Sequence, residues 1–326
     1  MKISILTGNI KLIDEQFAEK LRAFGEVVWY KNSKDLSVDE LKKILSESEI
    51  AITGWASPML PAHENGWKLK YICHITGELK RIMPPSYFTP DSSVKVTNWG
   101  DDFSFATAEG AVALLFSVLK MIPDLDALIR KDGNADNRKI GLCTLHKTRV
   151  GIYGLSTIGR LVAEYLKPFN PIISYYDPTV KVCPEGLTCC KTLEELFSSN
   201  DIITIHAGLN DYTRGTVNYK LLSMLPQDGI IINTARGPIV VEEELGKILH
   251  EGNLRAGIDV SAFEADFNSS PYAATPNTIL TGHAMSFIGK MERIALQEIS
   301  HLNITRFVNK EPLKHIVSPE KYKLMT

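Results

Sequence analysis

Three ionisable side chains in the last third of the chain could act together on a carbonyl compound. They are Arg236, Glu264 and His283, with the glutamate 28 residues after the arginine and 19 before the histidine. The planar guanidinium of an arginine binds a carboxylate at two points and polarises a neighbouring carbonyl. An imidazole, which titrates near about pH 6.5, gives and takes a proton at neutral pH, and a paired carboxylate raises its pKa and keeps it protonated. Reduction of a 2-oxo acid requires these three groups.

Each of these residues also has an ordinary structural explanation. Taken singly, an arginine, glutamate or histidine is more often a surface or ion-pair residue than a catalytic one. Arg236, however, follows an apolar run that ends at Asn233, and His283 follows the strand-like run 278–280. In a parallel sheet, both residues would lie at the carboxyl edge, where ligands bind in such folds.

A glycine-containing turn supplies a candidate site for a phosphate group. The segment VGIYGLSTIGR has Gly154 and Gly159 at the first and third positions of a GxGxxG frame, after a strand-like run and before a helical one. The first glycine permits a tight turn, and the third lets helix and strand pack closely. The second position is Ser156, which could displace a cofactor through its Cβ or hydrogen-bond a phosphate through its hydroxyl. The helix start at Thr157 and Ile158 would add free N–H groups and a positive dipole.

Asp177 indicates which dinucleotide this turn would favour. It ends the next strand-like run, about 20 residues after the turn, as the dinucleotide fingerprint requires. Its carboxylate could accept hydrogen bonds from the ribose hydroxyls, whereas a 2′-phosphate would meet a like charge and no arginine in residues 178–180. The sequence therefore predicts NAD rather than NADP. The structural alternative is a plain strand, turn and helix with two turn glycines.

Strand-like and helical runs alternate along the chain, which predicts doubly wound α/β sheets. In the first hundred residues the strand-like runs lie at 3–6, 27–30, 50–53, 69–73 and 94–97, with helical runs at 12–21 and 36–45. A buried helix at 106–121 and a polar, exposed connection at 123–147 follow. Further strands are predicted at 150–153, 172–176, 202–205, 230–233, 258–260 and 278–280, with helices at 242–250 and 291–308. At 326 residues the chain exceeds one core, so two domains are expected.

The composition argues against several classes of protein. Lys and Arg number 36 against 38 Asp and Glu, without runs of like charge, which does not suit a binder of nucleic acid or anionic membranes. No run of about 18 apolar residues occurs, and the N-terminal MKISILTG is too short for a targeting signal. The five cysteines form no CxxC pair and have no histidine at metal-ligand spacing. We therefore expect a cytoplasmic protein without a metal site.

From Leu145 to His283 the chain resembles the cofactor domain of the D-isomer-specific 2-hydroxyacid dehydrogenases. The segments that carry the resemblance, in the family's order, are VGIYGLSTIGR with YYDP, NDIITIHAGLNDYTRGTVN, LLSMLPQDGIIINTARGPIVVEEEL, LRAGIDVSAFEAD and PNTILTGH. The most specific part is INTARG followed by a downstream DV and a late histidine.

The resemblance implies an NAD-dependent hydride transfer to or from C2 of a small 2-oxo or 2-hydroxy acid of the D series. It makes Arg236, Glu264 and His283 the catalytic residues. It also implies that Thr76 and Gly77, in the segment HITGEL, offer backbone N–H groups to the substrate carboxylate. Additional cofactor-pocket residues would be His206, Thr234, Ala235 and Asp259, the last accepting the nicotinamide amide.

The domain organisation that follows from the resemblance has a cleft between two α/β domains. Residues 104–291 would form a Rossmann-type NAD-binding domain. Residues 1–103 and 292–326 would form a discontinuous, flavodoxin-like substrate domain. A homodimer through the cofactor domain is also implied.

Several positions depart from the family's usual pattern and indicate a divergent member. They are Ser156 in the glycine frame, Glu78 in the substrate loop, Gly208 where the family has proline, and Gly282 where the family has proline before the histidine. A non-catalytic, NAD-sensing regulator is one alternative, favoured by Ser156 and Gly282. A formate dehydrogenase is the other, and its pattern has glutamine where this chain has Glu264.

Overall fold

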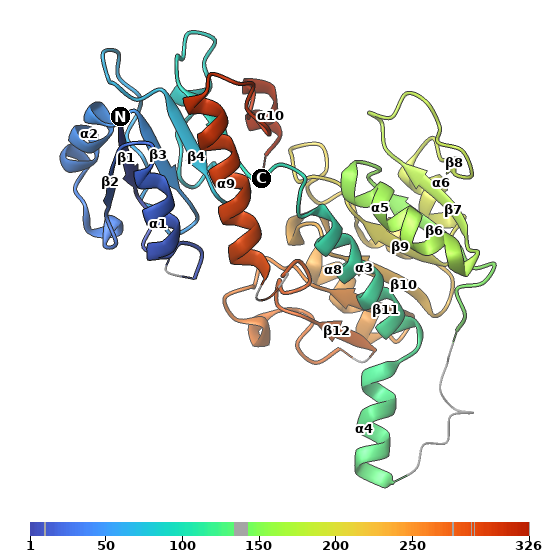
Figure 1. Cartoon of the computed structure of the whole chain (residues 1–326). Helices are drawn as coiled ribbons and strands as arrows, with labels where there is room; N and C mark the ends of the chain where they lie inside the picture. Colours follow the sequence, from blue (N-terminus) through green and yellow to red (C-terminus); the bar gives the residue numbers. More distant parts are fainter. Residues whose placement is uncertain (10, 134–142, 276, 288, 290, 326) are drawn as a thin grey trace. The chain divides into compact units, whose positions relative to one another are not determined.

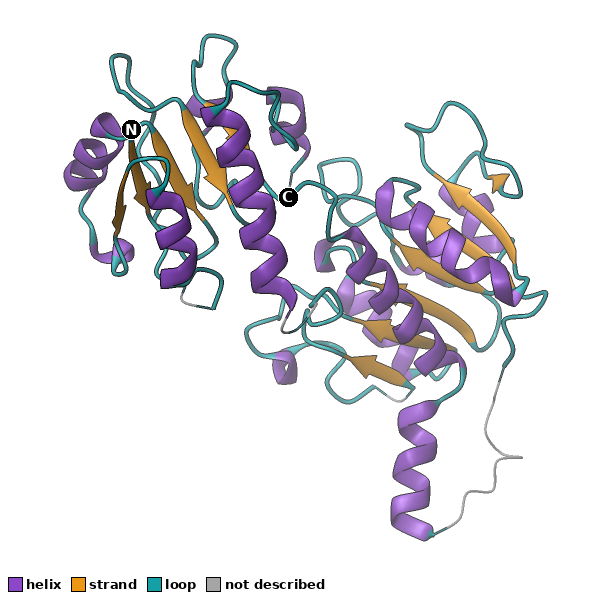
Figure 2. Cartoon of the chain, viewed as in Figure 1, coloured by secondary structure: helices purple, strands orange, loops and turns teal. Residues whose placement is uncertain are grey.

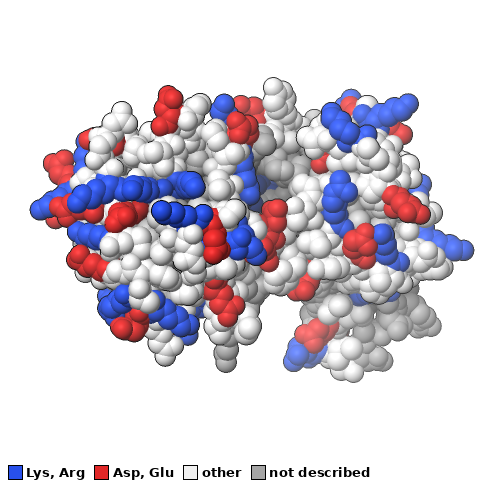
Figure 3. Space-filling model, turned by 45° about the horizontal axis from the view of Figure 1, so that its top comes forward, with Lys and Arg blue, Asp and Glu red and all other residues white. Residues whose placement is uncertain are grey.

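The computed structural model describes the chain except for residues 10, 134–142, 276, 288, 290 and 326. The chain divides into two compact units, one made of Met1–Phe103 with Ile288–Thr326 and the other of Ser104–Phe287. Figure 2 shows that each unit consists of a sheet flanked by helices. On the face drawn in Figure 3, acidic and basic side chains are interspersed. None of the described helices is long and apolar enough to cross a membrane.

Within the described residues, the first unit has a five-stranded parallel sheet with the order β2-β1-β3-β4-β5 (Figure 1). Its strands are β1 (Lys2–Ile5), β2 (Glu26–Trp29), β3 (Ile50–Thr53), β4 (Tyr71–His74) and β5 (Lys95–Thr97). Its helical segments are α1 (Glu15–Arg22), η1 (Ser33–Asp35), α2 (Val38–Glu47), η2 (Pro85–Phe88), α9 (Met291–Val308) and α10 (Pro319–Leu324). This strand order is that of flavodoxin-like folds, as predicted.

Helices α1 and α2 of the first unit begin at side-chain caps and bury apolar residues. The side chain of Asp14 accepts the N–H of Phe17 at the start of α1, and Ser37 and Glu40 form a reciprocal capping box on α2. One apolar cluster joins α1 and α9 to the sheet, and a second cluster joins α2 and α10 to it. Helix α9, from the last part of the chain, therefore belongs to the same core as the first strands.

The second unit contains, in the part that is described, a seven-stranded parallel sheet with the order β12-β11-β10-β9-β6-β7-β8. The strands are β6 (Arg149–Tyr153), β7 (Ile172–Tyr176), β8 (Thr188–Cys189), β9 (Ile202–Ile205), β10 (Gly229–Asn233), β11 (Leu254–Ile258) and β12 (Thr278–Leu280). The helical segments are α3 (Ser104–Leu119), α4 (Ile122–Asp132), α5 (Thr157–Leu166), η4 (Lys167–Phe169), α6 (Leu193–Ser198), α7 (Tyr219–Leu222), η5 (Gly237–Ile239), α8 (Glu242–His250) and η6 (Phe267–Ser269).

The strand order of the second unit reverses direction between β6 and β9. From β6 the chain proceeds to β7 and β8 on one side, and then to β9 through β12 on the other. Apolar clusters cover both faces, one with α3 and α5 and the other with α6, α7 and α8. In such sheets, ligands bind beyond the carboxyl ends of the strands at this reversal.

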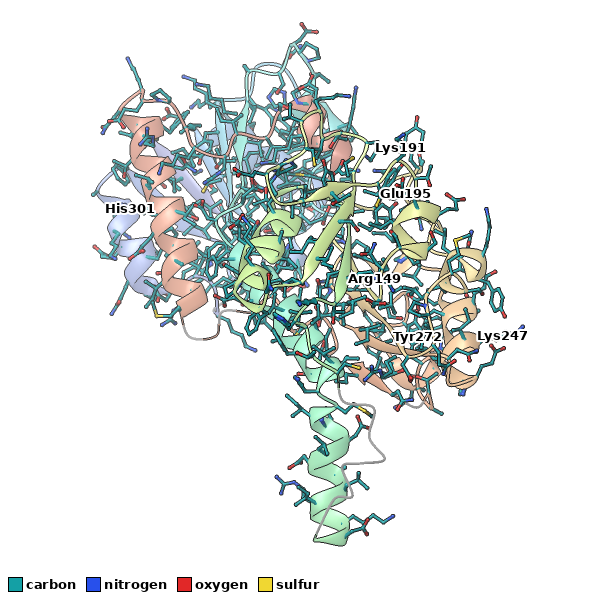
Figure 4. All side chains as sticks on the ribbon, turned by 90° about the vertical axis from the view of Figure 1, so that its right-hand side faces the viewer. Arg149, Lys191, Glu195, Lys247, Tyr272 and His301 are labelled. Atoms are coloured by element: carbon teal, nitrogen blue, oxygen red, sulfur yellow. The ribbon has the colours of Figure 1, made fainter. Side chains whose placement is uncertain are left out.

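An ion pair joins the amino ends of β6 and β9, and side-chain hydrogen bonds fix the start of α6. The Arg149 guanidinium pairs with the Asp201 carboxylate and holds the pKa of that carboxyl below its usual range. At the start of α6, the hydroxyl of Thr192 accepts the N–H of Glu195, whose carboxylate accepts the N–H of Lys191 at 2.6 Å (Figure 4). Thr192 is therefore the N-cap of α6, and the glutamate bonds to the residue before the cap.

The connection predicted over 123–147 is exposed in its first part, as expected, but that part is helical, which was not predicted. Leu145, near its end, is buried in the core. Residues Ile122–Asp132 form α4, which projects from the second unit and buries none of its side chains (Figure 1). Ile122, Leu125, Leu128 and Ile129 follow the spacing of one helix face and form an apolar stripe, and the last three residues of the helix are charged. The rest of the predicted connection includes 134–142, which lie outside the described residues.

Candidate active site and cofactor-binding turn

The glycine turn lies between β6 and α5, at the reversal of the strand order. Gly154 has a φ of 91°, and a Cβ on it would lie 2.5 Å from the backbone nitrogen of Ala207. A Cβ on Gly159 would overlap the carbonyl oxygen of Gly154. Both positions therefore require glycine, one for backbone conformation and the other for the close approach of helix and strand.

Ser156 is tolerated at the second position because its backbone is ordinary. It is the N-cap of α5, with a φ of −79°, and its side chain makes no capping hydrogen bond. Ser156 and Thr157 line a cavity of about 700 Å³, whereas Ile158 packs partly buried against the core. The cavity is lined by Leu155, Ser156, Thr157, Arg160, Leu161, Thr179, Val180, Lys181 and Val182.

Asp177 lies after β7 and is bonded to the turn itself. Its Oδ2 accepts the N–H of Leu155 at 2.8 Å, and its Oδ1 accepts the N–H and the hydroxyl of Thr179 at 2.9 and 2.6 Å. Both carboxylate oxygens thus hold the backbone around the cavity. The contact of Asp177 with a ribose remains a prediction.

Two cations on the cavity wall were missed by sequence reasoning. Arg160 follows the last glycine of the frame, and Lys181 directly follows residues 178–180, which contain no arginine. Both side chains are exposed. Their positions in the sequence could have indicated them: Arg160 lies one turn into the helix that follows the glycine turn, and Lys181 lies shortly after the strand that precedes Asp177.

Two polar atoms at the carboxyl ends of β9 and β10 have no hydrogen-bond partner among the described residues. They are Nδ1 of His206 and Oγ1 of Thr234, both buried. The other ring nitrogen of His206 lies 2.8 Å from the hydroxyl of Thr204, and burial lowers the pKa of His206 to about 3. A buried polar atom without a partner is costly, so a bound polar ligand would satisfy both atoms. These atoms and the glycine turn fit a dinucleotide.

Arg236 lies in a tight backbone segment directly after β10. Its Nη1 donates to the carbonyl of Ala235 at 2.7 Å, and the Asn233 amide donates to the carbonyl of Arg236 at 3.1 Å. A Cβ on Gly237 would lie 2.5 Å from the backbone carbon of Ser261. The arginine is therefore positioned by two neighbouring strand ends. Ala235, predicted as a cofactor contact, is partly buried against the core.

Glu264 and His283 are brought together. Oε2 of the glutamate lies 3.1 Å from Nδ1 of the histidine, and both side chains are a little over 40% exposed. His283 has a φ of 58°, and Gly282 before it has a φ of 63°. The predicted pairing of these two side chains therefore has the required geometry.

Asp259, at the end of β11, is buried beside the histidine loop. Its Oδ1 accepts the hydroxyl of Thr281 at 2.6 Å and the N–H groups of Ala284 and Met285 at 2.9 and 3.2 Å. Its carbonyl oxygen accepts the N–H of His283 at 2.5 Å. The contact of Asp259 with the nicotinamide amide remains a prediction.

Thr76 and Gly77 lie in the first unit, after β4, in a fixed loop. The hydroxyl of the buried Thr76 lies 2.7 Å from Nε2 of His74, whose Nδ1 lies 2.9 Å from the hydroxyl of Thr53. A Cβ on Gly77 would lie 2.6 Å from the ring of Trp99. The loop therefore has little freedom of its own.

The two charged side chains next to this loop, Glu78 and Lys80, form hydrogen bonds with backbone groups. Nζ of Lys80 donates to the carbonyl of Lys323 in α10 at 3.1 Å. The Glu78 carboxylate accepts the backbone N–H of Lys80. Within the described residues no cluster of His, Cys, Asp or Glu could hold a metal ion.

Comparison with known proteins agrees with the architecture of the second unit. The family model for the NAD binding domain of the D-isomer specific 2-hydroxyacid dehydrogenases matches residues 112–284. The chain is 32% identical over 223 residues to a glyoxylate/hydroxypyruvate reductase of Arabidopsis thaliana, covering 68% of each chain. It is 29% identical to a glyoxylate reductase of Pyrococcus horikoshii, covering 97% of this chain and 94% of that one.

Solved structures resemble the whole chain in fold. A glyoxylate reductase from Paecilomyes thermophila matches with a TM-score of 0.82 at 19% identity, covering 98% of this chain and 99% of that one. A D-2-hydroxyisocaproate dehydrogenase matches with a TM-score of 0.79 at 17% identity, covering 98% and 100%.

The fold and the turn define an α/β dehydrogenase with a dinucleotide-binding domain. The chain belongs to the D-isomer specific 2-hydroxyacid dehydrogenases, as an NAD-dependent and divergent member. The predicted family, the α/β fold and the cofactor NAD are thereby confirmed.

Proposed function

We propose that this enzyme transfers a hydride reversibly between NAD(H) and C2 of a small 2-oxo or 2-hydroxy acid of the D series. The observation that carries the proposal is the 3.1 Å pair of Glu264 and His283, in the same unit as the glycine turn. Arg236 follows β10 in that unit and supplies the cation.

The proposed roles follow from the chemistry of these side chains. Arg236 binds the substrate carboxylate through its planar fork and polarises the adjacent carbonyl. Because Nδ1 of His283 faces Glu264, Nε2 is the ring nitrogen left for the substrate oxygen. In reduction, His283 donates a proton to the ketone oxygen, and in oxidation it accepts the hydroxyl proton. Glu264 orients the ring through its contact with Nδ1. NADH, when bound, supplies the hydride to C2.

The cofactor contacts are proposed on the same basis. Gly154, Ser156 and Gly159 would hold the pyrophosphate at the start of α5, with the N–H groups of Thr157 and Ile158. Asp177 would contact the ribose. His206, Thr234, Ala235 and Asp259 would line the remainder of the cofactor site.

The first unit is proposed as the substrate domain, in line with the predicted division at 1–103 with 292–326 and 104–291. Thr76 and Gly77 would offer backbone N–H groups to the substrate carboxylate. We also propose that the chain forms a homodimer. Helix α4 buries none of its side chains within its own unit, and its apolar stripe is available to contact a second copy of the chain.

The relatives suggest which acids to test first. The two relatives from Arabidopsis thaliana and Pyrococcus horikoshii are named glyoxylate/hydroxypyruvate reductase and glyoxylate reductase, so we propose glyoxylate and hydroxypyruvate as first substrates. Consumption of NADH should be measured with these acids and with pyruvate, 2-oxoisocaproate and phenylpyruvate. NADH binding without turnover of any acid would favour the regulator, and oxidation of formate would favour a formate dehydrogenase.

Two variants test the residue roles. Arg236→Ala and His283→Ala should each lower kcat/KM by about 10²- to 10⁴-fold, with the Kd of NADH nearly unchanged. Arg22→Ala and His250→Ala are matched controls, because both side chains are exposed, and they should keep normal turnover. Retained turnover in either site variant would refute the assigned role.

A further inference from the structure

Two residues of the segment after β11 contact His283, one at its ring and the other at its backbone. Glu264 in this segment contacts the imidazole ring, while Asp259 contacts the backbone of the loop that carries it. The backbone carbonyl of Asp259 accepts the N–H of His283, and its carboxylate accepts two further N–H groups and one hydroxyl. Ring and backbone of the histidine are thus bound by residues only five positions apart.

The backbone of the histidine loop explains why it needs this support. Gly282 and His283 both have left-handed φ values, of 63° and 58°. A non-glycine residue in this region is unfavourable by about 1 kcal/mol or more, so His283 would leave it unless other contacts hold the loop.

Successive N–H groups beside left-handed residues form a concave site for an anion. In this loop the N–H groups of Ala284 and Met285 both point to one atom, Oδ1 of Asp259. The hydroxyl of Thr281 donates to the same oxygen at 2.6 Å from the other side of the turn. Asp259 is 2% exposed, so water competes little for these hydrogen bonds.

We infer that Asp259 is a positioning residue, which fixes the catalytic orientation of His283 by binding the 281–285 loop through Oδ1, with Thr281 as its side-chain partner. The inference rests on the proposed role of His283. Asp259 is also expected to contact the nicotinamide amide. Positioning of the histidine loop is a second function of this residue, and Oδ1 carries it.

Thr281→Val tests the inference because it removes one donor and keeps the shape of the side chain. We expect kcat to fall by about tenfold, the range for loss of one hydrogen bond to a charged group. The KM of the oxo acid and the Kd of NADH should change by less than about twofold. In the enzyme without NADH, the amides of Ala284 and Met285 should exchange with solvent about tenfold faster. Thr281→Ser keeps the hydroxyl and should restore both readouts.

Asp259→Asn separates the two functions of the aspartate. The amide oxygen can still accept from the loop, so protection of the two amides should be largely kept, whereas Asp259→Ala should abolish it. Unchanged amide exchange in Thr281→Val and in Asp259→Ala would overturn the inference. Full turnover of His283→Ala would instead refute the proposed function. The amide-exchange measurement needs no activity, so it would still test the loop contact independently.

Discussion

Acidification should destabilise the first unit through His74. This histidine is buried beneath the substrate loop, between the hydroxyls of Thr53 and Thr76, and burial lowers its pKa to about 3. In the unfolded chain a histidine titrates near about 6.5. As the pH falls below that value, the unfolded chain binds a proton that the folded unit does not bind. The stabilisation is therefore present above about pH 6.5 and is lost progressively as the pH falls towards about 3.

The size of the effect follows from this difference in pKa. Each pH unit below the unfolded value costs about 1.4 kcal/mol, so His74 should lower the free energy of unfolding by about 2 kcal/mol at pH 5. That is a large part of the stability of an ordinary domain, which is about 5–15 kcal/mol.

Tryptophan fluorescence can follow this unit alone. All four tryptophans, Trp29, Trp55, Trp67 and Trp99, belong to it. Urea unfolding at pH 7.5 and pH 5 should show a pH dependence that is about 2 kcal/mol smaller in His74→Gln than in the unchanged protein. Any loss of stability common to both pH values cancels in this comparison.

His206→Gln is the matched control, because His206 is equally buried but belongs to the second unit. It should leave the pH dependence of the tryptophan-detected transition unchanged. If His74→Gln keeps the full pH dependence of the unchanged protein, then His74 takes up its proton in the folded state as easily as in the unfolded state. The reasoning from burial would then be wrong.

Two further predictions concern the cofactor turn. Gly159→Ala should abolish NADH binding and lower the melting temperature, because the added Cβ overlaps the carbonyl oxygen of Gly154; normal NADH fluorescence titration would contradict this. Asp177→Ala should lower the NADH/NADPH affinity ratio by about tenfold, since it removes the carboxylate and leaves Arg160 and Lys181 on the cavity wall. An unchanged ratio in titrations with both nucleotides would show that Asp177 does not face the ribose.

Much of the secondary structure could be predicted because apolar periodicity is a local property. The helices predicted at 242–250 and 291–308 have the observed bounds, and the predicted strands overlap the observed ones. The pairing of Glu264 with His283, predicted from the sequence, is also present in the structure. By contrast, the polar composition of α4 concealed its apolar stripe, so its helical structure was missed.

The hydrogen-bond partners of Asp177 and Asp259 could not be predicted from the sequence. Asp177 was predicted to face a ribose, yet both of its oxygens bond to the protein, one of them to Leu155, 22 positions earlier. Asp259 bonds to residues 22–26 positions later. Such partners depend on how strand ends and loops meet in three dimensions, and residue spacing alone does not specify it.

The left-handed backbone at Gly282 has a practical consequence for protein engineering. Replacing unusual residues by those common in a family often stabilises an enzyme, and proline in a loop stabilises it by restricting the unfolded chain. Here the family's usual residue before the histidine is proline, whose ring holds φ near about −65°. The observed φ of 63° is incompatible with that ring. A consensus library for this enzyme should therefore retain glycine at position 282.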